Sequence, residues 1–173
     1  MKKLLPLILL IALITAQNIE AQSVRKSQKG IVTQKIANTE ISLEYHRPVA
    51  RGRVLFGENG IVKFDKIWMP GANEATTIEV SEDIEINGSE LKKGKYSVWS
   101  IPNEEEWTII FSKKWDAWHS RYPEGEDELR VKAYIEEGSH MEVLAYYFPE
   151  VTEESAVLRL HWGSTVIPLD IKL

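Results

Sequence analysis

The sequence predicts an all-β fold: a single-domain antiparallel β-sandwich, jelly-roll-like or immunoglobulin-like, with at most one or two short helices. Most of the 173-residue chain alternates apolar and polar side chains with a period of two, which is the pattern of half-buried strands. Turn-forming residues separate these stretches at short intervals, as they do in sandwiches. No apolar helical pattern of about ten residues lies between them, so a βαβ arrangement is not expected.

The first 21 residues have the form of a secretory signal peptide. Lys2 and Lys3 precede an uncharged apolar stretch, Leu4 to Ala16, that is shorter than the about 20 residues of a membrane span. Cleavage after Ala21 or Ala16 is expected, with an uncleaved anchor as the alternative. The chain has no cysteine, which excludes a lipoprotein anchor. We therefore expect a periplasmic or secreted protein with no stable membrane insertion after cleavage.

After this leader, residues 22–30 are polar and read as a flexible lead, and residues 31–173 read as one domain. No repeat, low-complexity segment or linker divides the domain. Without cysteine it has no disulfides and must fold on its hydrophobic core alone, which is feasible at about 150 residues.

The expected strands follow one another with turn signals between them. EISLEY places Ile41, Leu43 and Tyr45 on one face. Asn87-Gly88 is the strongest short hairpin signal in the chain, and Pro-Asn-Glu-Glu between two later strands predicts a second hairpin. A short helix fits only around SKKWDAWHSR, residues 112–121. In chain order the strands are IVTQKI, EISLEY, TTIEV, DIEI, YSVWSI, EWTIIF, ELRVKAYIEE, MEVLAYYF, AVLRLHW and TVIPLDIKL.

Composition excludes several classes of function. The net charge of -5 makes the chain a poor binder of nucleic acid, which needs a basic face. No metal site and no cofactor are expected, because cysteine is absent and the four histidines lack ligand spacing. The chain has neither a G-x-S-x-G elbow nor a cysteine nucleophile, so no catalytic residue is assigned. The histidines are His46, His119, His140 and His161.

Six tryptophans are many for this length, and indole rings on a sandwich can stack on sugars or other ligands. We interpret five of them as core residues or as aromatics that girdle the ends of the sandwich. Trp68 is the exception, because it precedes an irregular turn instead of lying within a strand.

The segment HRPVARGRVLFG, residues 46–57, places Arg47, Arg51 and Arg53 in one loop that follows a strand. Arginine is suited to bidentate capture of carboxylate or phosphate, and such a cluster is unusual in an acidic chain. The alternative is that these arginines pair with the protein's own carboxylates, Glu74 among them.

The segment IWMPGANEATTIEV, residues 67–80, enters a strand through a polar turn. If Ile78 faces the core, Glu74 and Thr76 share its face, and the carboxylate needs a cationic partner. We expect the turn and Trp68 to lie against the arginine loop and to form the mouth of one polar pocket. The candidate ligand-binding residues are Arg47, Arg51, Arg53, Trp68, Asn73, Glu74 and Thr76.

Three stretches carry a resemblance to a known family: YHRPVARGRVLFG, IWMPGANEATTIEVSEDIEINGSELKKGKYSVWSIPNEEEWTIIFSK and DELRVK. They resemble the secreted family catalogued as domain of unknown function 2911, over roughly residues 24–173. The resemblance implies a β-rich fold and export into a Gram-negative envelope. Two positions depart from the family pattern: Met69 replaces an arginine, and Lys63-Phe64-Asp65 replaces a Pro-Tyr-Gly-like turn. If that arginine belongs to a ligand pocket, this member binds weakly or differently.

The favoured interpretation is an exported sandwich that binds, without catalysis, a small polar or anionic ligand or an envelope component. One alternative is a hydrolase acting on envelope or carbohydrate material, with Glu74 as acid or base. Another is a structural envelope module without a ligand. A shifted pKa in a pocket would favour the enzyme, and the absence of a pocket beside the 71–77 turn would favour the structural module.

Overall fold

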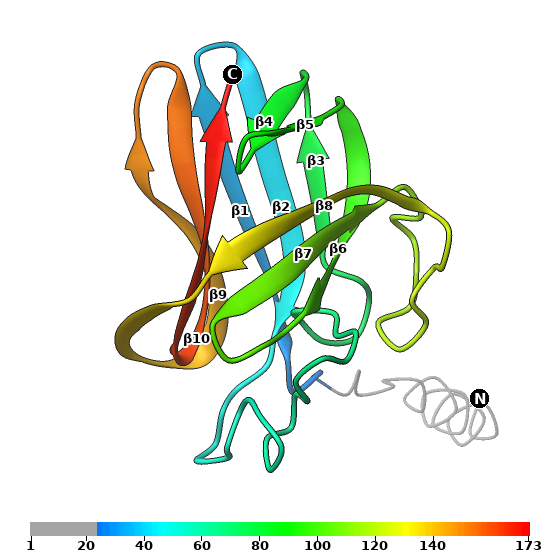
Figure 1. Ribbon diagram of the computed structural model, residues 1–173, viewed down its shortest axis with the longest axis vertical. Coiled ribbons are helices and arrows are strands. Elements are labelled where there is room, and N and C mark those ends of the chain that lie inside the picture. The colour runs from blue at the N-terminus through cyan, green and yellow to red at the C-terminus, as the bar shows by residue number, and fades with distance from the viewer. Residues whose placement is uncertain (1–23) are drawn as a thin grey trace, which may run out of the picture.

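The computed structural model describes residues 24–173, so the expected signal peptide lies outside the described residues. Within residues 24–173 the regular structure consists of ten strands and no helix. The strands form two antiparallel sheets that pack face to face (Figure 1). The prediction of an all-β sandwich is therefore confirmed. No helix long and apolar enough to span a bilayer occurs in this part of the chain.

The two sheets share the strands unequally. Six strands form one sheet in the order β1-β2-β3-β6-β7-β8, and four form the other in the order β5-β4-β10-β9. Only Ile135 separates β8 from β9, so the chain crosses between the sheets there. The six-stranded sheet comprises β1 (Gln28–Ile36), β2 (Thr39–Arg47), β3 (Thr77–Val80), β6 (Gly94–Ile101), β7 (Glu106–Ser112) and β8 (Asp127–Tyr134). The four-stranded sheet comprises β4 (Ile84–Ile86), β5 (Ser89–Leu91), β9 (Glu136–Val151) and β10 (Ser155–Lys172).

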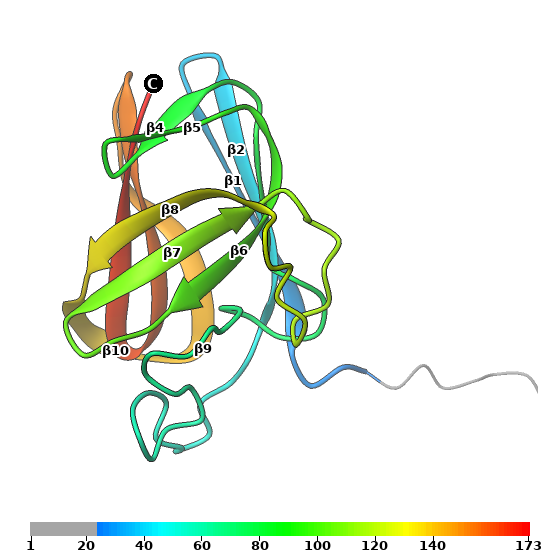
Figure 2. The same cartoon turned by 45° about the vertical axis from the view of Figure 1, so that its right-hand side comes forward.

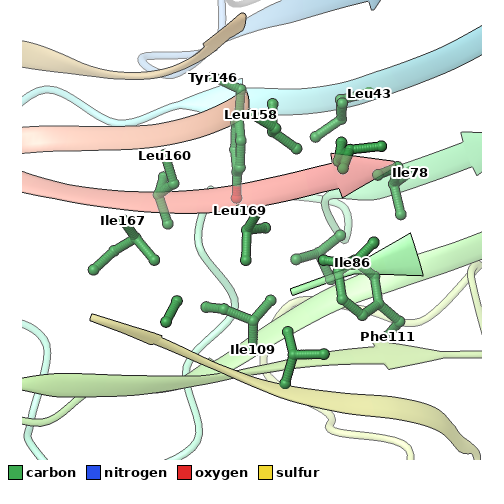
Figure 3. Close-up of a cluster of buried hydrophobic side chains, with 14 of the residues drawn as sticks. Leu43, Ile78, Ile86, Ile109, Phe111, Tyr146, Leu158, Leu160, Ile167 and Leu169 are labelled. Carbon is green, nitrogen blue, oxygen red and sulfur yellow. The ribbon is translucent and has the colours of Figure 1, made fainter. Parts of the chain in front are cut away.

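The core fills the space between the sheets and follows the period-two pattern. Ile41, Leu43 and Tyr45 of β2 are at most 4 % exposed, as the alternation in EISLEY predicts. Figure 3 shows side chains from both sheets directed toward one another. Those labelled are Leu43, Ile78, Ile109 and Phe111 from the six-stranded sheet and Ile86, Tyr146, Leu158, Leu160, Ile167 and Leu169 from the four-stranded sheet.

Both predicted hairpins form. Asn87 and Gly88 have φ angles of 48° and 75° and connect β4 to β5, as a type I′ turn requires. Strands β6 and β7 pair antiparallel across the Pro-Asn-Glu-Glu turn. The segments AVLRLHW and TVIPLDIKL are one continuous strand, β10, because register shifts on either side of Gly163 let the chain bend without ending the sheet.

The segment around residues 112–121 does not form a helix. It opens the connection between β7 and β8, residues 113–126, which turns irregularly. Ala117 and Tyr122 of this connection pack against a small apolar cluster of Met69, Trp99 and Ile110. Because the spacing of these two anchors does not match a helical turn, burying both of them favours an irregular path.

The longest connection in the described chain, residues 48–76, joins β2 to β3. Figure 2 shows much of it, in cyan to green, below both sheets. Isolated bridges tie it to the sandwich, from Val49 to Val143 and from Trp68 to Ser100. Connections longer than about 12–15 residues without their own secondary structure are uncommon in compact domains and are often functional.

The N-terminal lead is shorter than the sequence indicates. Strand β1 begins at Gln28, three residues before the expected start of the domain, and Gln28 pairs with Arg47 of β2. This register brings residues 25–27 beside the long connection.

Candidate functional site

A pocket of about 300 Å³ opens where the long connection meets the lead and the middle of β10. The structure brings Arg51, Arg53, Trp68 and Gly71 to this pocket, as the sequence analysis expects for the loop and the turn. We call it the arginine pocket and define it by Lys26, Arg51, Arg53, Trp68, Gly71 and Trp162.

The backbone of the loop holds the guanidinium group of Arg53. Its Nε donates to the carbonyl oxygen of Ala50 at 2.9 Å, and its Nη2 donates to that of Val49 at 2.6 Å. A guanidinium carries five N–H donors, so three remain for a ligand. The side chain is therefore positioned before any ligand arrives.

Arg51 occupies a sparsely populated backbone region, with φ 55°. Its backbone N–H donates to the Glu142 carboxylate at 2.6 Å, which fixes the loop to β9. His140 lies 3.0 Å from the same carboxylate, and their hydrogen bond lowers the pKa of Glu142. Backbone strain in a residue that is not glycine is concentrated at functional sites in proteins.

The cationic side chains of this pocket form no ion pair among residues 24–173, although the charge of Arg51 contributes to the lowered pKa of Glu142. None of Lys26, Arg51 and Arg53 lies within 4.0 Å of a carboxylate oxygen there, whereas most other cations of the domain pair with an acid. No acidic side chain of the described residues lines the pocket. In a chain whose net charge is -5, this pocket is a local positive site.

Aromatic rings form the inner wall of the pocket. Trp68 and Trp162 are stacked, with ring centroids 6.1 Å apart and planes 12° apart, and Phe56 and Trp107 pack edge-on against Trp68. The indole N–H of Trp162 is buried and has no acceptor within the described chain. An unsatisfied buried donor costs about 1–3 kcal/mol.

Glu74 does not pair with the arginine loop, so that part of the sequence interpretation is wrong. Its carboxylate accepts two hydrogen bonds from Arg25, at 2.6 and 2.5 Å, and lies 3.5 Å from Nδ1 of His46. The pairing of β1 with β2 causes this, because it delivers the lead to the 71–74 turn. Glu74 lines a second pocket instead.

The pKa of Glu74 argues against one proposed role. The hydrogen bond from Arg25 lowers the pKa of Glu74 below its ordinary value. A general acid at neutral pH needs a raised pKa. The carboxylate that the hydrolase alternative would use as an acid is therefore ionised and paired.

Three further candidates, Thr76, Asn73 and Arg47, do not line the pocket, and the first two of them hold the turn. The buried hydroxyl of Thr76 donates to the carbonyl oxygen of Pro70 at 2.9 Å. The amide of Asn73 donates to the carbonyl oxygen of Ser27 at 3.3 Å, and Nδ1 of His119 donates to the Asn73 carbonyl oxygen. Arg47 donates through Nε to the carbonyl oxygen of Leu144 at 3.2 Å, which ties β2 to β9.

Met69, where the resemblance implies an arginine, is buried and packs in the small cluster with Trp99 and Ile110. Its sulfur accepts a hydrogen bond from the backbone N–H of Thr76 at 3.2 Å. The side chain at position 69 is thus directed at this cluster and does not line the arginine pocket.

Sequence reasoning missed Lys26, Ser27 and Trp162, which all line the pocket. Lys26 and Ser27 fall in the segment that reads as a flexible lead. Trp162 ends the alternating run AVLRLHW and so reads as an ordinary strand residue. The local sequence pattern gives no signal for the lead residues or for Trp162, because strand pairing brings all three to the pocket. No group of three or more potential metal ligands occurs within residues 24–173.

Comparison with known proteins identifies one family. The sequence pattern of a family described as "Protein of unknown function (DUF2911)" matches residues 27–171, nearly the whole described domain. No curated protein and no solved structure matches the chain.

Proposed function

This chain belongs to the DUF2911 family, and we propose that it is an exported protein that binds a small anionic ligand in the arginine pocket without catalysing a reaction. The observation that carries the proposal is the set of three cations, Lys26, Arg51 and Arg53, without acidic partners around one pocket. Cations left unpaired in an acidic protein create a favourable potential for an anion.

The chemistry of the lining suggests the kind of anion. The guanidinium groups of Arg51 and Arg53 match the paired oxygens of a carboxylate or phosphate. Trp68 and Trp162 offer apolar surface beside them for a ring or a short apolar group. A volume of about 300 Å³ lies at the lower end of ligand pockets, so the ligand is small or is one group of a larger envelope component.

Binding without catalysis fits the remaining groups. Among the described residues, no carboxylate, histidine or thiol lines the pocket, so the hydroxyl of Ser27 has no carboxylate or histidine there to act as its base. Glu74, the carboxylate of the 71–74 turn, pairs with Arg25 and lines another pocket.

The test is calorimetric titration of the mature protein with inorganic phosphate and with phenyl phosphate, whose ring can meet the tryptophans. Replacement Arg51→Gly should weaken binding at least about tenfold, since hydrogen bonds to charged groups contribute about 1.5–3 kcal/mol. Stability should change by less than about 1 kcal/mol, because glycine accepts the φ of 55° without strain. Binding should also weaken as salt is added.

Lys35→Gln is the matched control, because it removes one charge from the opposite end of β1. It should leave both affinities unchanged. Absence of binding for both anions, or equal weakening by the two substitutions, would contradict the proposal.

A further inference from the structure

The second pocket, which Glu74 lines, has a volume of about 290 Å³. It lies where strands β2, β3 and β6 meet the connection of residues 113–126, the yellow-green loop at the right of Figure 1. We call it the tryptophan pocket and define it by Glu44, Glu74, Lys95, Trp115, Asp116 and Trp118.

The two tryptophans of this pocket do not fill a core. Trp115 and Trp118 are each 47 % exposed, although the apolar cluster of Trp99 lies nearby. Tyr122 and Ala117 anchor the loop to that cluster instead. Exposed aromatic surface next to a pocket is a mark of a binding site, because indole is costly to leave in water.

The loop that carries these rings is fixed in place. Glu74 and Trp118 form an isolated antiparallel bridge, and the backbone N–H of Ala75 donates to the carbonyl oxygen of Ala117 at 3.3 Å. The hydroxyl of Tyr122 donates to the Asp127 carboxylate at 2.6 Å. A pre-organised loop loses little conformational entropy when a ligand binds.

Each carboxylate of the pocket pairs with a cation. Glu44 lies 2.7 Å from Lys29, and Asp116 lies 3.0 Å from Lys114. Glu74 pairs with Arg25. Hydrogen bonds from these cations lower the pKa of Glu74 and of Asp116. The pocket thus combines charged acceptors and donors with little net charge.

One cation already uses an indole face. The ammonium group of Lys95 lies 4.7 Å from the ring centroid of Trp115, a cation–π distance. An organic cation as ligand would compete with Lys95 and would meet carboxylates that are already paired. An anion would meet three carboxylates here, Glu44, Glu74 and Asp116, whereas no carboxylate among the described residues lines the arginine pocket.

We propose that the tryptophan pocket binds a neutral saccharide unit. The C–H face of a sugar ring is apolar and matches the exposed indole faces of Trp115 and Trp118. Its hydroxyl groups both donate and accept hydrogen bonds, so they can pair with the fixed carboxylates and ammonium groups around the rings. A hydrogen bond to a charged group is stronger than a neutral one.

The test uses the mature protein labelled with 5-fluorotryptophan, so that each indole gives its own ¹⁹F resonance. Titration with cellobiose and with the disaccharide of N-acetylglucosamine, up to about 10 mM, should shift the resonances of Trp115 and Trp118 and leave those of Trp68 and Trp162 in place. Replacement Trp118→Ala should weaken binding at least about tenfold, and Trp115→Ala should also weaken it. Tyr134→Ala, which removes a 70 % exposed ring elsewhere, is the matched control and should have no effect.

The outcomes separate this site from the arginine pocket. Phenyl phosphate should shift Trp68 and Trp162 in the same sample, so either site can fail while the other stands. If neither saccharide shifts Trp115 or Trp118, or if choline shifts them and the saccharides do not, the proposal is overturned. The unfolding midpoint of each tryptophan variant checks that the fold is retained.

Discussion

The arginine pocket and the tryptophan pocket are both built on the turn between Pro70 and Thr76, but their charges are balanced differently. In the arginine pocket no cationic side chain forms an ion pair within the described chain, and no carboxylate of the described residues lines it. In the tryptophan pocket each carboxylate has a cationic partner. In our proposals, the balance of charge, more than the type of charged residue, distinguishes the ligands of the two pockets.

The lead of the chain produces this difference. Arg25 pairs with Glu74 and so neutralises the tryptophan pocket, whereas the next residue, Lys26, lines the arginine pocket and stays unpaired. Neighbouring cations thus serve two pockets. Substitutions in the turn should therefore affect both pockets, and substitutions in the lead should separate them.

Gly71→Ala should have the largest effect and should break both pockets. A Cβ atom at this position would lie 2.4 Å from Oγ1 of Thr76, so the turn must move. We expect a loss of about 1–3 kcal/mol in the free energy of unfolding, the usual cost of overpacking, measured by urea denaturation.

The matched experiment for this substitution is a double-mutant cycle with Thr76→Ala, which removes the obstructing oxygen. The double variant should be more stable than the sum of the two single effects predicts. If the effects of the two substitutions on the free energy of unfolding simply add, the clash with Thr76 does not cause the loss of stability.

Tyr146→Phe should have the next largest effect. The buried hydroxyl of Tyr146 donates to the Pro70 carbonyl oxygen at 3.0 Å, the same oxygen that Thr76 uses. Loss of this hydrogen bond should destabilise the fold by about 1 kcal/mol. Tyr134→Phe, at an exposed ring, should stay within about 0.5 kcal/mol of the wild type. Equal effects in urea denaturation would rule out the role of the hydrogen bond.

His46→Gln should have a smaller effect, visible only as a change in pH dependence. Burial lowers the pKa of His46, and the Glu74 carboxylate opposes this shift. The pKa of His46 in the folded protein lies below its unfolded value of about 6.5, so the folded state favours the neutral imidazole. This preference contributes to the free energy of unfolding above pH 6.5, and the contribution is lost as the pH falls through the folded pKa. The lowered pKa of Glu74 also causes a loss of stability as the pH falls, but only below the ordinary glutamate pKa of 4.5.

Urea denaturation at a series of pH values should therefore show a stability loss between about 6.5 and 4.5 that His46→Gln reduces. An unchanged slope in the variant would assign the loss to other groups.

Arg25→Gln should have the smallest effect and should sharpen the comparison. The ion pair with Glu74 is exposed, so its loss should weaken saccharide binding only about two- to threefold and should leave phosphate binding unchanged. Lys26→Gln should weaken phosphate binding alone. If Lys26→Gln also weakens saccharide binding, Arg25 and Lys26 do not act on separate pockets.

Much of the fold could be predicted because its signals are local. The burial of Ile41, Leu43 and Tyr45 follows from alternation along one strand, and the turn at Asn87-Gly88 follows from two adjacent residues. The grouping of Arg51 with Trp68 could also be predicted in part, since both belong to one long connection.

The sequence by itself determined the fold class, the strand faces and the arginine-bearing loop, since neighbours along the chain encode each of them. Only the tertiary structure decided that Arg25 pairs with Glu74, that Trp162 stacks on Trp68, and that Trp118 stays exposed. The physical reason is that strand register brings these groups together from distant positions. A register is set by the packing of the whole core and not by any single segment.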